Sequence, residues 1–174
     1  MPIDVLRSWL GLGRGTAAEP SALRELVNAL DQLEPERARY LARFAYLLGR
    51  VSLADRHASA EETAAMERLV AREGELSPEQ AMLVVSLAKS SNTLFGGTAD
   101  FTVAQEFAES ATYEQKLALA ACLFAVASTD DVISMAEETE IHRIVNQLKV
   151  HPSDLTKLRV AHRSSLPGLA PRKA

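Results

Sequence analysis

Six carboxylates stand in two short segments whose residue types recur at similar spacing. They are Asp55 and Glu62 in the first segment, and Asp130, Asp131, Glu137 and Glu138 in the second. Carboxylate oxygens are the ligands that hard cations such as calcium and magnesium prefer. We therefore take these six residues as a candidate divalent-cation site. The second segment is the better candidate, because Arg56 stands in the first segment where Asp131 stands in the second.

The same residues also fit a purely structural role. Ser59-x-x-Glu62 and Ser134-x-x-Glu137 both match a capping box, in which the serine bonds the N3 amide and the glutamate returns to the serine amide. Losing such a cap costs about 1 kcal/mol. In this interpretation Asp55 and Asp130 satisfy nearby loop amides. The sequence leaves both interpretations open and favours the structural one.

An EF-hand is excluded at the second segment. With Glu137 as the last of the twelve loop positions, the first and third positions fall on Val126 and Ser128, and the glycine position falls on Asp131. A loop without its opening acids has lost essential ligands. Any cation site here is expected to be shallower and to borrow carboxylates from elsewhere.

Other chemistry finds less support. Glu138 and His142 are i,i+4 neighbours, but two ligands do not make a zinc site, and an exposed helix pair is favoured. The chain has no nucleophile elbow, P-loop or dinucleotide fingerprint. A non-catalytic protein is therefore expected, and a small enzyme with a carboxylate-lined pocket is the alternative.

The elements that position these residues are all expected to be helical. Apolar residues recur at helical spacing, and no segment alternates with the period of a strand. Serine, threonine and proline start signals and glycine breaks divide the chain into about eight or nine helices, with a central loop at 90–100. The expected helices span about 2–12, 20–33, 35–51, 59–74, 77–87, a short segment around Val103 and Phe107, 112–127, 134–148 and 151–158. Residues 117–127 should be the most buried.

Composition supports one compact helical bundle. The 174 residues are 47% hydrophobic but only 5% aromatic, which favours a core of leucine, alanine and valine. The single cysteine, Cys122, excludes an intramolecular disulfide and fits a reducing compartment. No apolar run is long enough for a membrane span, and no signal peptide is recognised. We expect a cytoplasmic protein.

Three regions are expected along the chain: an N-terminal amphipathic segment (1–15), a helical domain (16–163) and a flexible basic tail (164–174). The first segment carries the only tryptophan, Trp9, with Arg7 and Arg14 beside its apolar side. Docking onto the domain or onto a partner is favoured for it. Attachment to an anionic membrane surface, which would make the protein a peripheral membrane adaptor, is the alternative.

Charge is unevenly distributed. Residues 100–140 hold nine acids and one base, whereas residues 143–174 hold seven bases and one acid. One helix face carries Arg39, Arg43, Tyr46 and Arg50. It either binds phosphate or an acidic partner, or is a solvated face whose positive charge compensates that of the acidic helices. The second interpretation is favoured. The overall net charge of −4 argues against nucleic acid.

Each acidic segment follows a helical run and precedes another, which predicts an internally duplicated helix–acidic turn–helix unit. The second copy reads Ala127-Ser-Thr-Asp130-Asp131-Val-Ile133-Ser134-x-x-Glu137-x-x-x-Ile141-x-x-Ile144, with a weaker copy from Ala54. On these residues the chain resembles the TerB-like tellurite-resistance family, whose fold is similar to the N-terminal domain of the DjlA co-chaperones. The resemblance covers roughly residues 41–158. The family usually has glycine after the aspartate, where this chain has Arg56 and Asp131.

This resemblance implies a non-catalytic helical module of bacterial stress physiology. Such proteins are associated with tellurite resistance, proposed metal sensing and assemblies at the inner membrane. The expected partner is therefore a protein, with peripheral inner-membrane association as a further expectation. Full co-chaperone activity is not expected, because the chain has no J-domain motif.

Overall fold

The computed structural model describes residues 21–53, 59–95, 100–130, 132–162, 164 and 166. Within these ranges the side chains of residues 21–23, 52–53, 90–95, 100–101 and 130 are not described. The predicted N-terminal helix at 2–12 and the turn residues 54–58 therefore lie outside the described part of the chain.

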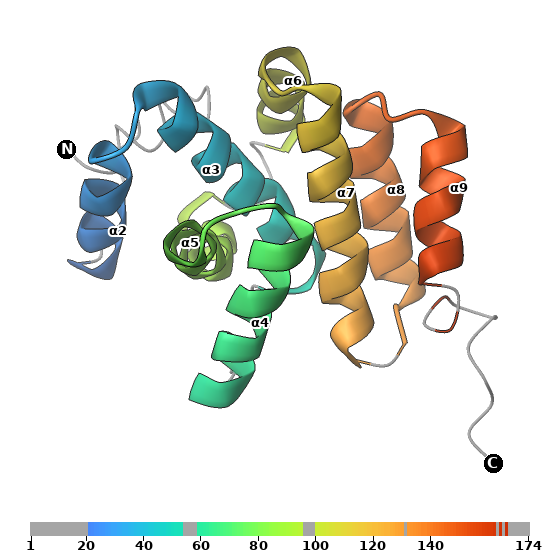
Figure 1. Ribbon diagram of the computed structural model, residues 1–174, viewed down its shortest axis with the longest axis horizontal. Helices are drawn as coiled ribbons and strands as arrows, with labels where there is room; N and C mark the ends of the chain where they lie inside the picture. Colours follow the sequence, from blue (N-terminus) through green and yellow to red (C-terminus); the bar gives the residue numbers. More distant parts are fainter. Residues whose placement is uncertain are drawn as a thin grey trace.

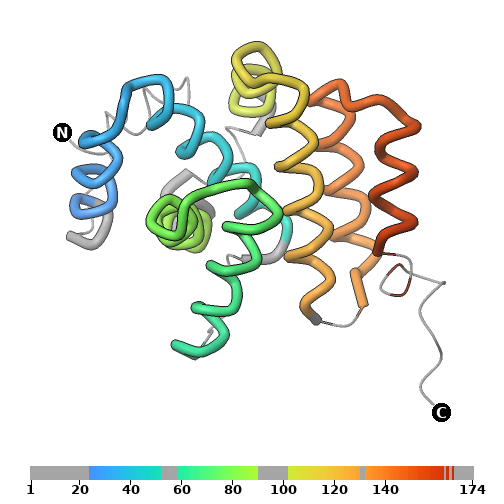
Figure 2. Tube along the Cα trace, viewed as in Figure 1, coloured from blue at the N-terminus to red at the C-terminus, as the bar shows by residue number. Residues whose placement is uncertain are grey.

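The described residues form helices and no strand, which confirms the all-α prediction (Figures 1 and 2). Short π-helical and 3₁₀ segments follow α3 and α7. The elements are α2 (Ser21–Asp31), α3 (Pro35–Leu48), η1 (Gly49–Leu53), α4 (Ala60–Glu73), α5 (Pro78–Phe95), α6 (Asp100–Ser110), α7 (Tyr113–Ala127), η2 (Ser128–Asp130), α8 (Met135–Gln147) and α9 (Pro152–Ala161).

The helix starts lie where local chemistry predicts them. Ser59, Thr112 and Ser134 each close a full capping box at the start of α4, α7 and α8. Pro35 and Pro152 occupy the first turn of α3 and α9, where a missing N–H costs nothing. The predicted central loop is shorter than expected, because α5 continues to Phe95 and α6 begins at Asp100.

Two helices end in the same way without glycine in the left-handed position. After α4, Glu75 has φ 55° and the Leu76 amide bonds the Ala71 carbonyl at 3.0 Å. After α8, Lys149 has φ 59° and the amide of the next residue bonds back across five residues in the same manner. Both are Schellman motifs. Gly74 is the C-cap of α4 but has a right-handed backbone, with φ −83°.

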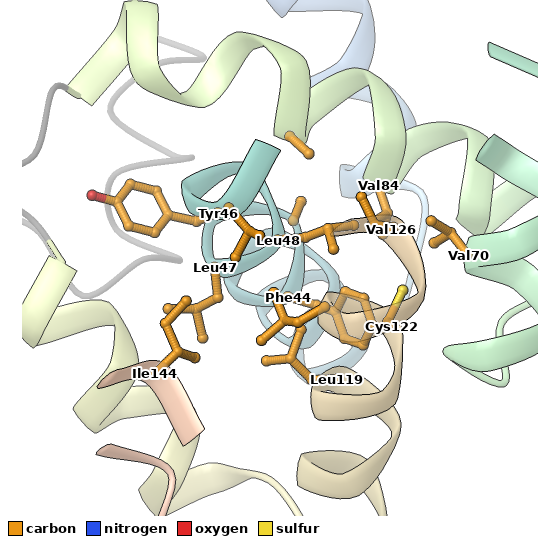
Figure 3. Close-up of a cluster of buried hydrophobic side chains, with 14 of the residues drawn as sticks. Phe44, Tyr46, Leu47, Leu48, Val70, Val84, Leu119, Cys122, Val126 and Ile144 are labelled. Atoms are coloured by element: carbon orange, nitrogen blue, oxygen red, sulfur yellow. The ribbon is translucent and has the colours of Figure 1, made fainter. Parts of the chain in front are cut away.

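The core surrounds α7, as predicted from its apolar sequence. Phe124 of α7 and Phe44 of α3 are fully buried, and Phe107 of α6 packs against Phe44 with ring centroids 6.5 Å apart. Figure 3 shows Phe44 close to Leu119 and Cys122 of α7. Leu166 belongs to the region predicted as a tail, yet it is 2% exposed and part of this core.

The arrangement of α4, α7 and α8 sets the positions of the two acidic turns. Both α4 and α8 pack against α7, and they run antiparallel to it on opposite sides (Figure 1). The N-termini of α4 and α8, capped by Ser59 and Ser134, therefore lie at the same end of the molecule as the C-terminus of α7. We call this end the capped end.

The predicted duplication stays a prediction. The helices α4 and α8 share a capping box at the start and a Schellman motif at the end. The segments before them differ, because α3 leads into the π-helical η1 whereas α7 leads into the 3₁₀ segment η2. Residues 54–58, on which an exact comparison of the turns depends, are not described.

Candidate functional site

In the first acidic turn, Asp55 lies outside the described residues, and Glu62 closes the cap of α4. Oε2 of Glu62 accepts from the Ser59 amide at 2.7 Å, and the Glu62 amide donates to Oγ of Ser59 at 3.2 Å. The structural role predicted for this pair is confirmed.

In the second turn, Glu137 plays the same part for α8. Its Oε2 accepts from the Ser134 amide at 2.8 Å, and its own amide donates to Oγ of Ser134 at 3.1 Å. Asp130 ends η2, with its side chain undescribed, and Asp131 lies outside the described residues. The relation of these two aspartates to Glu137 is therefore untested.

Glu138 forms an ion pair with an arginine side chain of the protein, Arg159. Nε and Nη2 of Arg159, on α9, donate to Oε1 of Glu138 at 3.1 and 2.8 Å. Nε2 of His142 lies 3.7 Å from the same oxygen. The i,i+4 pair predicted on α8 is present, but the Glu138 side chain is only 14% exposed. Arg159 therefore bonds the same carboxylate oxygen of Glu138 that lies nearest to His142.

The described acids do not converge on one point. Among the described residues, no group of three histidine, cysteine, aspartate or glutamate side chains is arranged to hold a metal ion.

The apolar residues of the second turn divide between core and surface. Ile133 is fully buried, whereas Val132 and Met135 are 47% and 68% exposed. We call Val132 and Met135 the apolar pair of the capped end.

The prediction of a solvated arginine face on α3 is wrong for Arg43 and Tyr46, which are buried, whereas the side chain of Arg39 is 39% exposed. Arg43 is 7% exposed and Tyr46 3%. Arg43 donates to Oγ of Ser110 at 3.1 Å and lies 3.5 Å from a carboxylate oxygen of Glu106. Arg43 therefore does pair with an acid of another helix, as expected, but its own side chain is buried.

Two of the remaining histidines, His151 and His162, make ring contacts with Tyr113 and Phe124 respectively. His151 is the N-cap residue of α9, but its side chain makes no cap bond. The ring of His162 stacks on Phe124, with centroids 5.8 Å apart, and its Nδ1 lies 3.0 Å from the Leu158 carbonyl. His57 lies outside the described residues.

A groove with acidic edges lies across α7, between the end of α4 and the first half of α9. Its volume is about 470 Å³. We call it the α4–α9 groove. Because its residues lie at the C-terminus of α4 and the N-terminal halves of α7 and α9, it is at the opposite end from the capped turns (Figure 1). It is lined by Arg72, Glu73, Glu75, Glu114, Leu117, Ala118, Ala121, Asp154, Lys157 and Leu158.

Asp154 is the acid of this groove with the strongest local interactions. Tyr113 donates to Oδ2 of Asp154 at 2.6 Å and accepts from the His151 amide at 3.0 Å. The bond from Tyr113, followed by that from Lys157, lowers the pKa of Asp154. Burial and the bond to Asp154 raise the pKa of Tyr113. Asp154 is therefore ionised at neutral pH, whereas a general acid needs a raised pKa.

Sequence reasoning missed the α4–α9 groove. The signal for its α4 edge was present. Glu75-Leu76-Ser77-Pro78 matches Lys149-Val150-His151-Pro152 in type, with an apolar residue, an N-cap and a proline after the helix end. Each apolar residue, Leu76 and Val150, is buried. The apposition of α4 and α9 across α7 depends on tertiary packing and has no local signal.

The class defined by these features is an all-helical domain with two serine-capped acidic turns. The family model described as tellurite resistance protein TerB matches residues 41–160. The match covers more than half of the chain, so the chain belongs to the TerB family, as the resemblance predicted. Comparison with curated proteins and with solved structures found no match.

The length and hydropathy of the helices show whether any of them could span a membrane. Within the described ranges, none of them combines the length and the apolar character needed to cross a bilayer.

Proposed function

We propose that this TerB-family protein is a non-catalytic interaction module, an adaptor in the bacterial response to tellurite or metal stress. One observation carries the proposal: the apolar pair Val132 and Met135 is exposed beside the second turn, while Glu137 and Glu138 next to it are engaged in a cap and an ion pair. Exposed apolar side chains next to fixed acids suit a protein contact better than a reaction.

The proposed partner is another protein. The net charge of −4 disfavours nucleic acid. We place the adaptor in the cytoplasm, with the amphipathic segment 1–15 as a means of reaching the inner face of the membrane. Family membership supports this proposal at the level of the fold, and the biological role is inferred from it.

A divalent cation, calcium or magnesium, is a second part of the proposal. Asp130, Asp131 and Glu137 are its proposed ligands in the second turn, and Asp55 and Glu62 their counterparts in the first. Oε2 of Glu137 accepts the cap bond, and Oε1 has no hydrogen bond or ion pair to the described residues. Glu138 is the weakest candidate ligand, because Arg159 already neutralises it.

The partner is tested by site-specific photocrosslinking in bacteria that express the full chain. A photoreactive amino acid at Val132 or Met135 should give a discrete adduct, identified by mass spectrometry. The matched control is Met82 of α5, which is also exposed, at 53%. With the photoreactive amino acid at Val132, Met135→Lys should abolish the adduct, and Val132→Lys with Met135→Lys should reduce growth on tellurite to that of cells without the protein. Equal labelling from Met82, or growth unaffected by the double variant, would contradict the adaptor role.

The cation is tested by calorimetric titration with calcium and then magnesium. Glu137→Gln is the informative variant, because glutamine also closes a capping box, as Gln115 does with Thr112 in this chain. It removes the carboxylate and keeps the cap. Binding should weaken at least tenfold in Glu137→Gln and in Asp130→Asn with Asp131→Asn. An absence of saturable heat, or equal binding by these variants, would remove the cation from the proposal.

A further inference from the structure

The α4–α9 groove has an apolar floor formed mainly by small side chains. Ala118 and Ala121 lie three residues apart on one face of α7, and Ala118 is 8% exposed. Leu158 of α9 packs partly against the core beside them. Both α4 and α9 pack against α7 and border this face on its two sides (Figure 1). Small residues leave a channel where larger ones would fill the space between the two helices.

The edges of the groove carry an excess of negative charge. Two of its acids are neutralised locally: Arg72 lies 3.1 Å from Glu73, and Lys157 lies 3.2 Å from Asp154. Glu75 and Glu114 are both exposed, and neither has a basic side chain within ion-pair distance among the described residues. Two carboxylates are therefore available at the edges, one from the end of α4 and one from the start of α7.

Glu75 is held at its edge in an uncommon conformation. Its φ of 55° is in the left-handed region, which normally favours glycine at this position of a Schellman motif. A glycine there would relieve the backbone but would remove the carboxylate from the groove.

We propose that the α4–α9 groove receives a basic amphipathic helix of a partner protein. Its apolar side chains lie on Ala118 and Ala121, and its lysine or arginine side chains pair with Glu75 and Glu114. Helix-in-groove recognition reads apolar anchors at i, i+3 and i+4 spacing, and charge complementarity selects the partner. This inference rests on the proposed adaptor function and gives it a second surface, at the opposite end from Val132 and Met135.

The chain's own basic end fits the groove less well. Residues 167–174 include Arg172 and Lys173, but Pro167 and Pro171 flank their only large apolar residue, Leu169. Proline in the interior of a helix removes a hydrogen bond and clashes with the preceding turn. This segment therefore does not match a helical ligand that needs several apolar anchors.

The test begins with a phage-displayed library of random 16-residue peptides selected on the full chain. The selection is run in parallel on Glu75→Arg with Glu114→Arg. A matched control, Glu25→Arg with Glu109→Arg, makes the same charge change at exposed acids of α2 and α6 outside the groove. The consensus peptide specific to the wild type is then synthesised, and its affinity is measured by fluorescence anisotropy.

The expected consensus has lysine or arginine on both sides of apolar residues at helical spacing. Its peptide should bind the wild type and the Glu25/Glu109 control alike, and at least tenfold more weakly to the Glu75/Glu114 variant. A peptide with its lysines changed to glutamate should regain affinity for the Glu75/Glu114 variant. NMR shifts on binding should centre on the amides of Ala118 and Ala121.

Four results would overturn the proposal. They are a consensus without basic residues, equal affinity of the two charge-reversed proteins, binding only after residues 167–174 are removed, and a dimer in the wild type that Glu75→Arg with Glu114→Arg dissociates. The third result would assign the groove to the chain's own end, and the fourth to a second copy. Because crosslinking at Val132 and Met135 uses the other end of the molecule, the adaptor role can survive these results, and the groove proposal can be judged separately.

Discussion

Arg50 and Glu140, 90 residues apart in the sequence, form an internal ion pair that joins η1 to α8. Nε of Arg50 donates to Oε1 of Glu140 at 2.8 Å, and Nη2 contacts the same oxygen. The Arg50 side chain is 5% exposed and that of Glu140 23%. A charge this well buried depends on its partner, since removing one member of a buried pair leaves the other uncompensated.

We therefore expect Glu140→Ala to lower the free energy of unfolding by about 2 to 3 kcal/mol, slightly below the usual range for a fully buried pair because Glu140 is partly solvated. Urea denaturation followed by circular dichroism measures this change. Arg143 provides the control, because it contacts the other oxygen of the same carboxylate at 3.5 Å but is 62% exposed. Arg143→Ala should cost under about 0.5 kcal/mol. Similar losses in both variants would contradict the importance of burial.

Two variants in the cap of α8 can distinguish the contribution of its hydrogen bond from that of its charge. Ser134→Ala should lower the free energy of unfolding by about 1 kcal/mol, because the Glu137 amide loses its acceptor. Glu137→Gln should cost less than about 0.5 kcal/mol, because an amide oxygen replaces the carboxylate oxygen in the box. The same urea experiment compares the two. A larger loss in Glu137→Gln than in Ser134→Ala would show that the charge, rather than the cap bond, stabilises this end of α8.

The left-handed residue after α8 leads to a stabilising variant. Lys149→Gly should raise the free energy of unfolding by about 0.5 to 1 kcal/mol, because glycine adopts φ 59° without steric cost. Lys149→Ala keeps the strain and should stay near the wild type. Thermal unfolding distinguishes them, and a Lys149→Gly protein that melts below Lys149→Ala would contradict the strain.

Gly74 is a different case, although it also follows a helix. Its backbone is right-handed, but a Cβ there would lie 2.7 Å from the Val70 carbonyl oxygen and 3.1 Å from Cζ of Phe44. Gly74→Ala should therefore destabilise the protein by about 1 to 3 kcal/mol, as overpacking does. Thermal unfolding is again the measurement. A neutral effect would mean that the Phe44 ring and the end of α4 shift at little cost.

Local signals in the sequence predicted where the helices begin, but they did not predict which helices pack against one another. The boxes at Ser59 and Ser134 were readable because every interacting atom lies within four residues. The burial of Arg43 was not readable, because its partner Ser110 lies 67 residues away and reaches α3 only through tertiary packing. Periodicity alone put Arg43 on a polar face. The same reason explains why Arg159, on α9, was not recognised as the cation that holds Glu138.

For the candidate site, too, the local interactions were predicted and the contacts between distant helices were not. The sequence identified Glu62 and Glu137 together with their structural alternative, and the structure realises that alternative for both. Whether they also contribute to a cation site depends on aspartates that lie outside the described side chains. The α4–α9 groove was not predictable, because its edges come from α4, α7 and α9.

The buried thiol of Cys122 and the partly buried hydroxyl of Tyr40 lead to a prediction for alkaline pH. Burial raises the pKa of the Cys122 thiol to about 12, from 9.0. Burial, opposed by the neighbouring Arg37, raises the pKa of Tyr40 to about 12, from 10.0. Each group holds its proton more tightly in the folded state. The stability that each contributes is therefore complete below its unfolded pKa and is lost as the pH rises towards the folded value.

Chemical denaturation at several pH values should show this loss in two stages. In the wild type, the decline due to Cys122 begins near pH 9 and that due to Tyr40 near pH 10. Each group adds a slope of up to about 1.4 kcal/mol per pH unit while only its unfolded form is ionised. Cys122→Ala should flatten the curve from pH 9 upwards, whereas Tyr40→Phe should follow the wild type to pH 10 and flatten it only above. If Cys122→Ala and the wild type decline in parallel between pH 9 and 10, the thiol ionises as easily in the folded protein as in the unfolded chain, and the packing of α7 around Cys122 admits water.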